Sequence, residues 1–332
     1  MPIPVSYRLC AGFFLWCTLA GAAQTATQSP GNLTKGDVPI FRSDVNLMNL
    51  YFNVKDRRGS PIGRLSKDDF LIADDGRPQA IQYFSAEAGQ PLTLGMLLDT
   101  SESLTPVWGM EQEAGAQFLQ RVLRVNDRAC LIGFDAHVYV LQEFTNSAET
   151  LRTALDGAYT GMGMDVGGRP PRQESTTRLH DAVVLAAGKT LSGEAGRKAM
   201  ILLTDGVDQG SYETLEAAIE AAQKADAIVY VILFHDWVTP PAFRPPAQFG
   251  REQMKPLADQ TGGRVIEAGT NKDGLKAAFD QIAADLRSQY YIGYTAADSN
   301  LDDKFHRIEI KTKNKGYRVQ ARTGYYATKH AN

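Results

Sequence analysis

The sequence predicts an α/β protein: a doubly wound, mostly parallel sheet with one antiparallel edge strand, inserted in a small β-sandwich built from the two ends of the chain. The middle of the chain alternates helical patterns with nearly continuous apolar strands such as AMILL and AIVYVIL. Such strands are typical of a parallel sheet whose two faces are covered by helices. Segments near both ends instead alternate apolar and polar residues with a period of two, which indicates half-buried strands.

The two outer segments predict the sandwich. The first contains NLMNLYFNVKD, KDDFLIADDGRPQ and AIQYFS, and the second contains SQYYIGYT, HRIEIKT and YRVQAR, with turn residues between them. A sheet of two or three strands is marginal in isolation. We therefore expect residues 37–90 and residues 289–328 to form one sandwich, with a separate domain over residues 91–288 between them.

The middle domain has six expected strands and five expected helices. Apolar runs predict strands over 92–98, 128–134, 138–144, 199–203, 228–233 and 265–268. Helical spacing of apolar residues predicts helices over 107–122, 179–191, 212–225, 253–261 and 275–287. Only Asp135-Ala136 joins the second strand to the third, so this pair must form a hairpin and run antiparallel at one edge.

Composition places the chain among ordinary globular proteins. It has 332 residues, of which 43% are hydrophobic and 22% charged, and this length allows two domains. Its formal net charge is -3, without the basic excess that nucleic acid or an anionic membrane surface would attract. Neither is expected as the main partner, so function must be sought in a local site.

The N-terminus predicts export. Arg8 precedes an apolar run over residues 9–20, and Ala20-Gly21-Ala22 resembles a cleavage site. We interpret residues 1–23 as a signal peptide and residues 24–36 as a flexible leader; an uncleaved anchor is the alternative. The run is too short for a spanning helix, so no membrane span is expected after cleavage. The expected location is bacterial: secreted, periplasmic or in the cell envelope.

Oxygen-bearing side chains gather where strands of the predicted parallel sheet end. Asp99 ends the first apolar strand, and Ser101 and Ser103 follow at intervals of two, a spacing that lets all three point to one side of a turn. Asp205 ends the later strand AMILLT, and Thr177 precedes a predicted helix. Ligands of such sheets bind beyond the carboxyl ends of the strands. An all-oxygen set without Cys or His favours a hard cation, Mg²⁺ first, with Mn²⁺ or Ca²⁺ as alternatives.

These residues also allow two other interpretations. Ser and Asp are preferred helix N-caps, so the stretch DTSES is also suited to start the next helix, and the two roles are compatible. A phosphatase of the aspartyl type needs a second carboxylate two residues after the first, where this chain has Ser101. His180 is the nearest candidate base, and G-x-S-x-G, H-E-x-x-H and P-loop motifs are absent. The sequence therefore does not favour an enzyme.

DTSES, the threonine of STTRLHDA and the TDG of LLTDGVD resemble the metal-ion-dependent adhesion site (MIDAS) of von Willebrand factor type A (vWA) domains. The outer segments resemble the secreted bacterial VWFA-related family, so the resemblance covers nearly all of the mature chain. It implies a vWA (Rossmann-like) sheet in which Ser101, Ser103 and Thr177 coordinate the cation directly or through water. Asp99 and Asp205 would act largely through bridging waters, leaving one coordination position open.

The resemblance has one local departure and implies a function. Family members often place Gly before the site threonine, where this chain has Thr176, which remains a lesser candidate for the ligand assigned to Thr177. The implied function is non-enzymatic adhesion: a protein partner binds through the cation and offers it an acidic side chain. A metal-independent structural or assembly module of the cell envelope is the alternative, and a metal-assisted hydrolase is a third candidate.

Two loops are candidate partner-binding surfaces. The loop FHDWVTPPAFRPPAQFG carries Trp237, Phe243 and Arg244, and exposed aromatic side chains beside an open cation would form a contact patch. The loop before Thr177 carries Arg169 and Arg172, which would favour acidic partners. The alternatives are an aromatic loop folded over its own sheet and arginines that are simply solvated.

Overall fold

The computed structural model describes residues 47–86, 89–161, 176–234, 249–269, 271–296 and 302–327. All of them belong to one compact unit, Val45–Asn332. The predicted signal peptide and leader lie outside the described residues. Among the residues that are described, no helix is long and apolar enough to cross a membrane.

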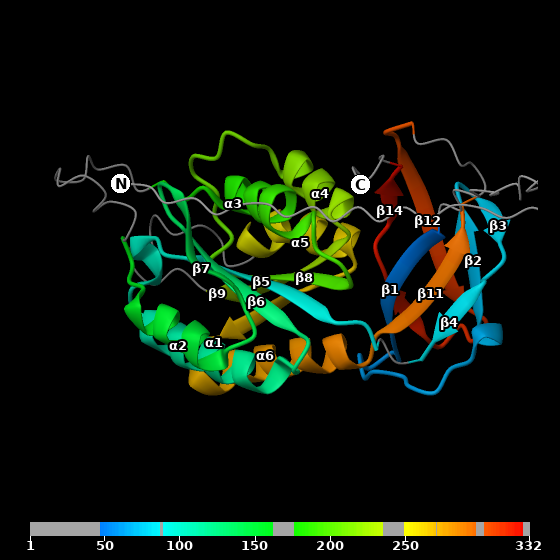
Figure 1. Cartoon of the computed structure of the whole chain (residues 1–332), viewed down its shortest axis with the longest axis horizontal. Coiled ribbons are helices and arrows are strands. Elements are labelled where there is room, and N and C mark those ends of the chain that lie inside the picture. Colours follow the sequence, from blue (N-terminus) through cyan, green and yellow to red (C-terminus); the bar gives the residue numbers. More distant parts are fainter. Residues whose placement is uncertain are drawn as a thin grey trace, which may run out of the picture. The chain divides into compact units, whose positions relative to one another are not determined.

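The middle of the chain forms a six-stranded sheet, which lies beside the strands from the two ends of the chain (Figure 1). Its strand order is β10-β9-β8-β5-β6-β7, and every neighbouring pair is parallel except β6 and β7. The strands are β5 (Leu92–Asp99), β6 (Arg128–Phe134), β7 (Val138–Thr145), β8 (Arg197–Thr204), β9 (Ala227–Phe234) and β10 (Val265–Gly269). Every residue of β5 and of β9 is buried, as their apolar sequences predict. This confirms the predicted fold class, although the β6–β7 loop has three residues, 135–137, rather than two.

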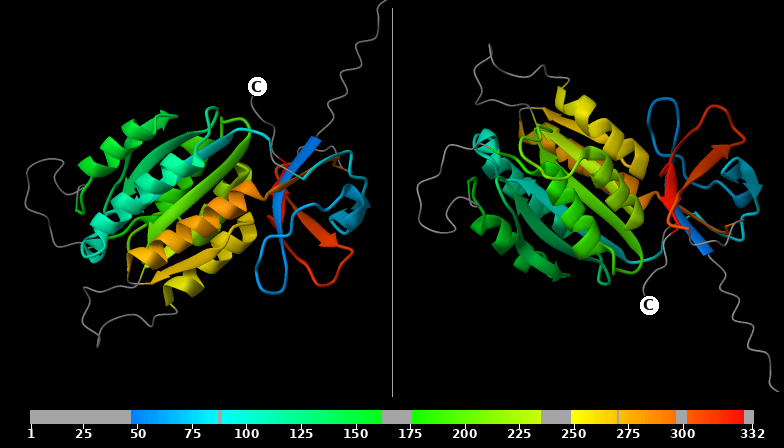
Figure 2. Two further views of the ribbon diagram at one scale, coloured as in Figure 1. Left: turned by 90° about the horizontal axis from the view of Figure 1, so that it is seen from below. Right: turned by 90° about the horizontal axis from the view of Figure 1, so that it is seen from above.

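Helices cover both faces of this sheet (Figures 1 and 2). One face packs against α1 (Trp108–Val122), α2 (Ala148–Gly157) and α6 (Lys272–Arg287). The other packs against α3 (Leu179–Leu185), its π-helical continuation (Ala186–Leu191), α4 (Leu215–Lys224) and α5 (Phe249–Thr261). The ring centroids of Phe118 and Phe279 lie 4.8 Å apart between α1 and α6. Helix α2 is absent from the sequence prediction.

Two four-stranded antiparallel sheets form the remainder, in the orders β13-β1-β11-β4 and β14-β12-β2-β3. The strands are β1 (Leu47–Lys55), β2 (Phe70–Asp74), β3 (Arg77–Gln79), β4 (Tyr83–Ser85), β11 (Tyr290–Thr295), β12 (Phe305–Thr312), β13 (Arg318–Gln320) and β14 (Gly324–Tyr326). A 3-10 turn, Lys67–Asp69, precedes β2 where the sequence predicted strand. Each sheet combines strands from both ends of the chain, and Phe52, Phe70 and Tyr290 pack between the sheets. Neither terminal segment of the chain forms one of these sheets without strands from the other segment.

Candidate functional site

The two predicted acids lie at the ends of adjacent strands of the six-stranded sheet. In the parallel register of β5 and β8, Leu98 pairs with Leu203, so the next residues, Asp99 and Thr204, lie side by side. The Thr204 hydroxyl donates to Asp99 Oδ2 at 2.7 Å. Asp205 follows directly. The sheet register therefore brings both acids to one edge, as the sequence predicted.

A chain of hydrogen bonds connects four of the five predicted ligands. The backbone N–H of Ser101 donates to Asp99 Oδ1 at 3.1 Å, and the hydroxyl oxygens of Ser101 and Ser103 lie 3.0 Å apart. Ser103 Oγ then donates to Asp205 Oδ2 at 2.9 Å. Ser101 precedes a 3-10 turn, Glu102–Leu104, but its side chain makes no cap hydrogen bond. Its hydroxyl faces the other site oxygens instead of capping a helix.

Thr177 is tied through its backbone to the loop that carries Asp205. Its carbonyl accepts from the backbone N–H of Gln209 at 2.9 Å, and the residue is 8% exposed. Asp208 Oδ1 accepts from the first amides of α3, those of Leu179 at 2.9 Å and His180 at 3.2 Å. Asp208 thus holds the loop before α3 against the loop after β8. Sequence reasoning missed this role because nothing local to Asp208 shows which amides it meets.

Thr176, the lesser candidate, packs against this same loop. A Cβ added at Gly210 would lie 3.1 Å from Thr176 Cβ, and Gly210 has a φ of +154°. At Gly206, whose φ is +79°, there is even less space, because an added Cβ would lie 2.8 Å from the Cα of Gly250. Glycine is needed here because both the backbone conformation and the available space exclude a side chain.

Thr100, between the predicted ligands, points to a different network. Its hydroxyl oxygen lies 2.5 Å from the Tyr139 hydroxyl oxygen and donates to Asp135 Oδ2 at 3.2 Å. The alternation of the turn therefore separates Thr100 from the side chains of Asp99 and Ser101. Its contacts fix the turn to the β6–β7 hairpin.

The site carries an excess of negative charge. Asp99 is fully buried, and burial followed by the charge of Asp205 raises its pKa, against hydrogen bonds from Ser101 and Thr204 that lower it. Glu111, on α1, was not among the predicted site residues. Burial raises the pKa of Glu111 well above its ordinary value, and the charges of Asp99 and Asp205 raise it further. A sequence signal existed, because Glu111 stands on the otherwise apolar, buried face of α1.

The donors present fit a hard divalent cation. Carboxylate and hydroxyl oxygens are the ligands that Mg²⁺, Mn²⁺ and Ca²⁺ prefer. Burial and the charge of Asp205 raise the pKa of Asp99, and burial together with the charges of Asp99 and Asp205 raises the pKa of Glu111. Both carboxylate oxygens of buried Glu111 have no hydrogen-bond partner among the described residues. A bound cation would offset the repulsion between these acids and would also compensate the buried Glu111 carboxylate for its missing partner.

The five candidate partner-binding residues lie outside the described residues: Trp237, Phe243, Arg244, Arg169 and Arg172. The described residues on either side of 235–248 lie near the site. Phe234 ends β9, and a Cβ added at Gly250, at the start of α5, would lie 2.2 Å from the backbone oxygen of Asp205.

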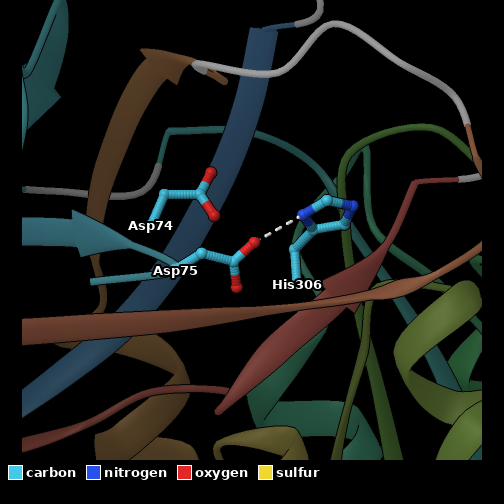
Figure 3. A group of neighbouring side chains, drawn as sticks. All are labelled: Asp74, Asp75 and His306. Atoms are coloured by element: carbon cyan, nitrogen blue, oxygen red, sulfur yellow. Dashed lines mark hydrogen bonds and ion pairs between the residues drawn. The ribbon is translucent and has the colours of Figure 1, made fainter. Parts of the chain in front are cut away.

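A second acidic group lies in the sandwich, formed by Asp74, Asp75 and His306 (Figure 3). His306 Nδ1 lies 2.9 Å from Asp75 Oδ2, and its Nε2 lies 3.2 Å from Asp302 Oδ1. Asp74 Oδ2 accepts from the hydroxyl groups of Tyr294 and Tyr325 at 2.9 and 3.0 Å. These side chains already satisfy one another, so the group is explained as a clamp between β2 and β12.

Comparison with known proteins gives remote similarity only. No family model matches the chain, and no curated protein matches it. Solved structures similar to it include BatB, a conserved hypothetical protein from Bacteroides thetaiotaomicron, at 16% identity and a TM-score of 0.44, covering 58% of this chain and 97% of that one. The vWF domain of the type V pili tip protein Mfa5 from Porphyromonas gingivalis is similar at 14% identity and a TM-score of 0.45, covering 58% and 94%.

Proximal thread matrix protein 1 from the mussel byssus, with a zinc-occupied MIDAS motif, is similar at 13% identity and a TM-score of 0.47. The match covers 64% of this chain and 49% of that one, so this chain corresponds to about half of the mussel protein. These similar structures include vWA domains, the family that the sequence resembles. At such identities and scores they carry no argument about function.

Proposed function

We propose that this protein is a non-enzymatic binding protein that holds a divalent cation at the carboxyl edge of the six-stranded sheet and binds a protein partner through it. The proposed ligands are Asp99, Ser101, Ser103, Thr177 and Asp205. The observation that carries the proposal is the chain of hydrogen bonds from Asp99 through Ser101 and Ser103 to Asp205. Mg²⁺ is the proposed cation, with Mn²⁺ or Ca²⁺ as alternatives. When bound, it supplies an open coordination position for an oxygen of the partner.

The same contacts support binding over catalysis. Asp99 is 0% exposed and accepts hydrogen bonds from the Ser101 amide and the Thr204 hydroxyl. This environment suits a carboxylate that acts on a cation through water better than a nucleophile that must contact a substrate. His180, the candidate base, has its Nδ1 3.7 Å from Asp208 Oδ2. Its backbone amide is also held by Asp208, which gives the residue a structural role at the start of α3.

The loops over 162–175 and 235–248 are the proposed partner surface, together with the cation. Arg169, Arg172 and Arg244 would contact an acidic partner, and Trp237 and Phe243 would supply apolar contact area. Export to the periplasm, the cell envelope or the medium is part of this proposal, since it rests on the predicted signal peptide.

Isothermal titration with Mg²⁺, Mn²⁺ and Ca²⁺ tests the cation site. Wild-type protein should give a binding heat that Asp99→Ala and Asp205→Ala lose. Glu102→Gln is the matched control, because this exposed residue lies in the same turn and is not a proposed ligand; its heat should equal that of wild type. Indistinguishable heats for wild type and both alanine variants would sink the proposal.

Pull-downs from cell-envelope extract, with and without EDTA, test the use of the cation. Partners that bind wild type and are lost with EDTA and in Asp99→Ala support cation-dependent binding. Identical partner sets with and without EDTA favour the metal-independent assembly module instead. Turnover of phosphate or ester substrates that disappears in Asp99→Ala would support the metal-assisted hydrolase.

A further inference from the structure

Glu111 is a buried acid without a hydrogen-bond partner. It lies in the first turn of α1, on the face that packs on the sheet together with Trp108, Gly115, Leu119 and Val122. The residue is 0% exposed, and neither carboxylate oxygen is hydrogen-bonded among the described residues. Buried charges in proteins are normally paired, so this arrangement needs a physical reason.

The geometry of α1 places Glu111 beneath the cation site. A Cβ added at Gly115 would lie 3.5 Å from Met96 Sδ, so Gly115 packs directly over the middle of β5. Helix α1 follows the end of β5 and runs back along the sheet. Glu111 precedes Gly115 by one turn, about 6 Å along the helix. On β5, the two residues from Met96 to Leu98 span a similar length, about 6.6 Å. Glu111 therefore lies about level with Leu98, the residue that precedes Asp99.

Electrostatics agrees with this placement. The charges that act on Glu111 among the described residues are those of Asp99 and Asp205, and both are negative. The positive N-terminal end of α1 favours an acid only weakly. The cost of burying a carboxylate without a partner is much larger. The helix end therefore does not explain why a carboxylate is placed here.

We propose that Glu111 is a third carboxylate of the cation site and adds its negative charge from the core side, beneath Asp99 and Asp205. This inference rests on the proposed function. A buried divalent cation offsets the carboxylate's unpaired charge, and the carboxylate in turn strengthens cation binding. Glu111 is thus unfavourable for the folded protein alone and favourable for its cation complex.

The test uses Glu111→Gln, Glu111→Met and the control Glu113→Gln. Glu113 lies on the same helix, but its side chain is 44% accessible and is paired with Arg152. Each variant is titrated with Mg²⁺ and Mn²⁺ by calorimetry, and its Tm is measured in EDTA and in excess cation. Both Glu111 variants should bind cation about 10–100-fold more weakly than wild type, as loss of a supporting group does at other metal sites.

In EDTA, Glu111→Gln should have a Tm at least equal to wild type, and Glu111→Met a higher one, because an apolar side chain replaces an unpaired acid. Glu113→Gln should leave cation affinity unchanged. Wild-type affinity in both Glu111 variants overturns the inference, while loss of binding in Asp99→Ala keeps the proposed function standing. Failure of both Glu111 variants to fold in EDTA also overturns it, since it predicts no loss of stability. Absence of cation binding in wild type overturns both proposals.

Discussion

Asp285 joins the six-stranded sheet's helices to the sandwich, and its removal is expected to destabilise the whole unit. The residue lies on α6 and is 1% exposed. Lys55 Nζ, from β1 of the sandwich, donates to its Oδ2 at 2.9 Å, and Arg264 Nε lies 2.9 Å from the same oxygen. The Asn53 side chain donates to its backbone oxygen at 2.7 Å. Asp285→Ala deletes the anion and leaves both cations in place.

The expected magnitude follows from the burial of the remaining charge. Lys55 is 8% exposed, and burial lowers its pKa, while Asp285 opposes that shift. Deleting one partner of a buried ion pair costs about 3–5 kcal/mol, because the other charge stays buried and unpaired. For a chain of this size about 2 °C of Tm corresponds to each kcal/mol, so a decrease of about 6–10 °C is expected.

Thermal and urea denaturation of Asp285→Ala measure this loss, and Asp280→Ala is the matched control. Asp280 lies on the same helix, but its side chain is 40% exposed and is contacted by Arg121 and Lys276. Exposed ion pairs contribute about 0–1 kcal/mol, so the control should unfold nearly as wild type does. An Asp285→Ala variant that loses no more stability than the control would refute the reasoning.

Two further predictions concern the loop before α3 and the His306 clamp. Asp208→Ala removes the acceptor of the first α3 amides and should cost about 1–2 kcal/mol in urea denaturation, with weaker cation binding because Thr177 loses its support; unchanged stability contradicts this. Burial lowers the pKa of His306, but Asp302 and Asp75 outweigh it and raise the pKa above its ordinary 6.5. The clamp's stabilisation is therefore full below about pH 6.5 and is lost as pH rises through the raised pKa. The stability advantage of wild type over His306→Gln should shrink across that window, and a pH-independent difference opposes the interpretation.

Burial explains which elements the sequence predicted. The central strands are buried on both faces, which requires nearly continuous apolar residues. Local sequence is therefore enough to predict these strands and a mostly parallel sheet. Helix α2 was missed because it buries only Leu151 and Leu155, and its start depends on Ser147 accepting from the Thr150 amide. Helix α4 was predicted to begin at residue 212, but Thr214 caps it and Leu215 is its first residue.

The residues of the candidate site also differ in whether local sequence predicts them. Asp99, Ser101 and Ser103 are close in sequence, so their spacing in one turn predicts that they meet. Asp205 was predicted because it follows a strand, and strand ends share an edge. Glu111 was missed because its relation to the site depends on which part of β5 lies beneath α1, and that packing is tertiary.

Charge balance at the carboxyl edge has a consequence for the partner. Two carboxylates, Asp99 and Asp205, neutralise a divalent cation, and a partner's carboxylate would then add to a neutral site. With Glu111 ionised, the bound site keeps a net negative charge, which opposes a further acid by Coulomb repulsion and favours a neutral carbonyl or amide oxygen. Glu111→Gln should therefore weaken cation binding yet improve the relative binding of acidic peptides over amidated ones at saturating Mg²⁺. Equal preference in wild type and Glu111→Gln would show that the third charge does not reach the open coordination position.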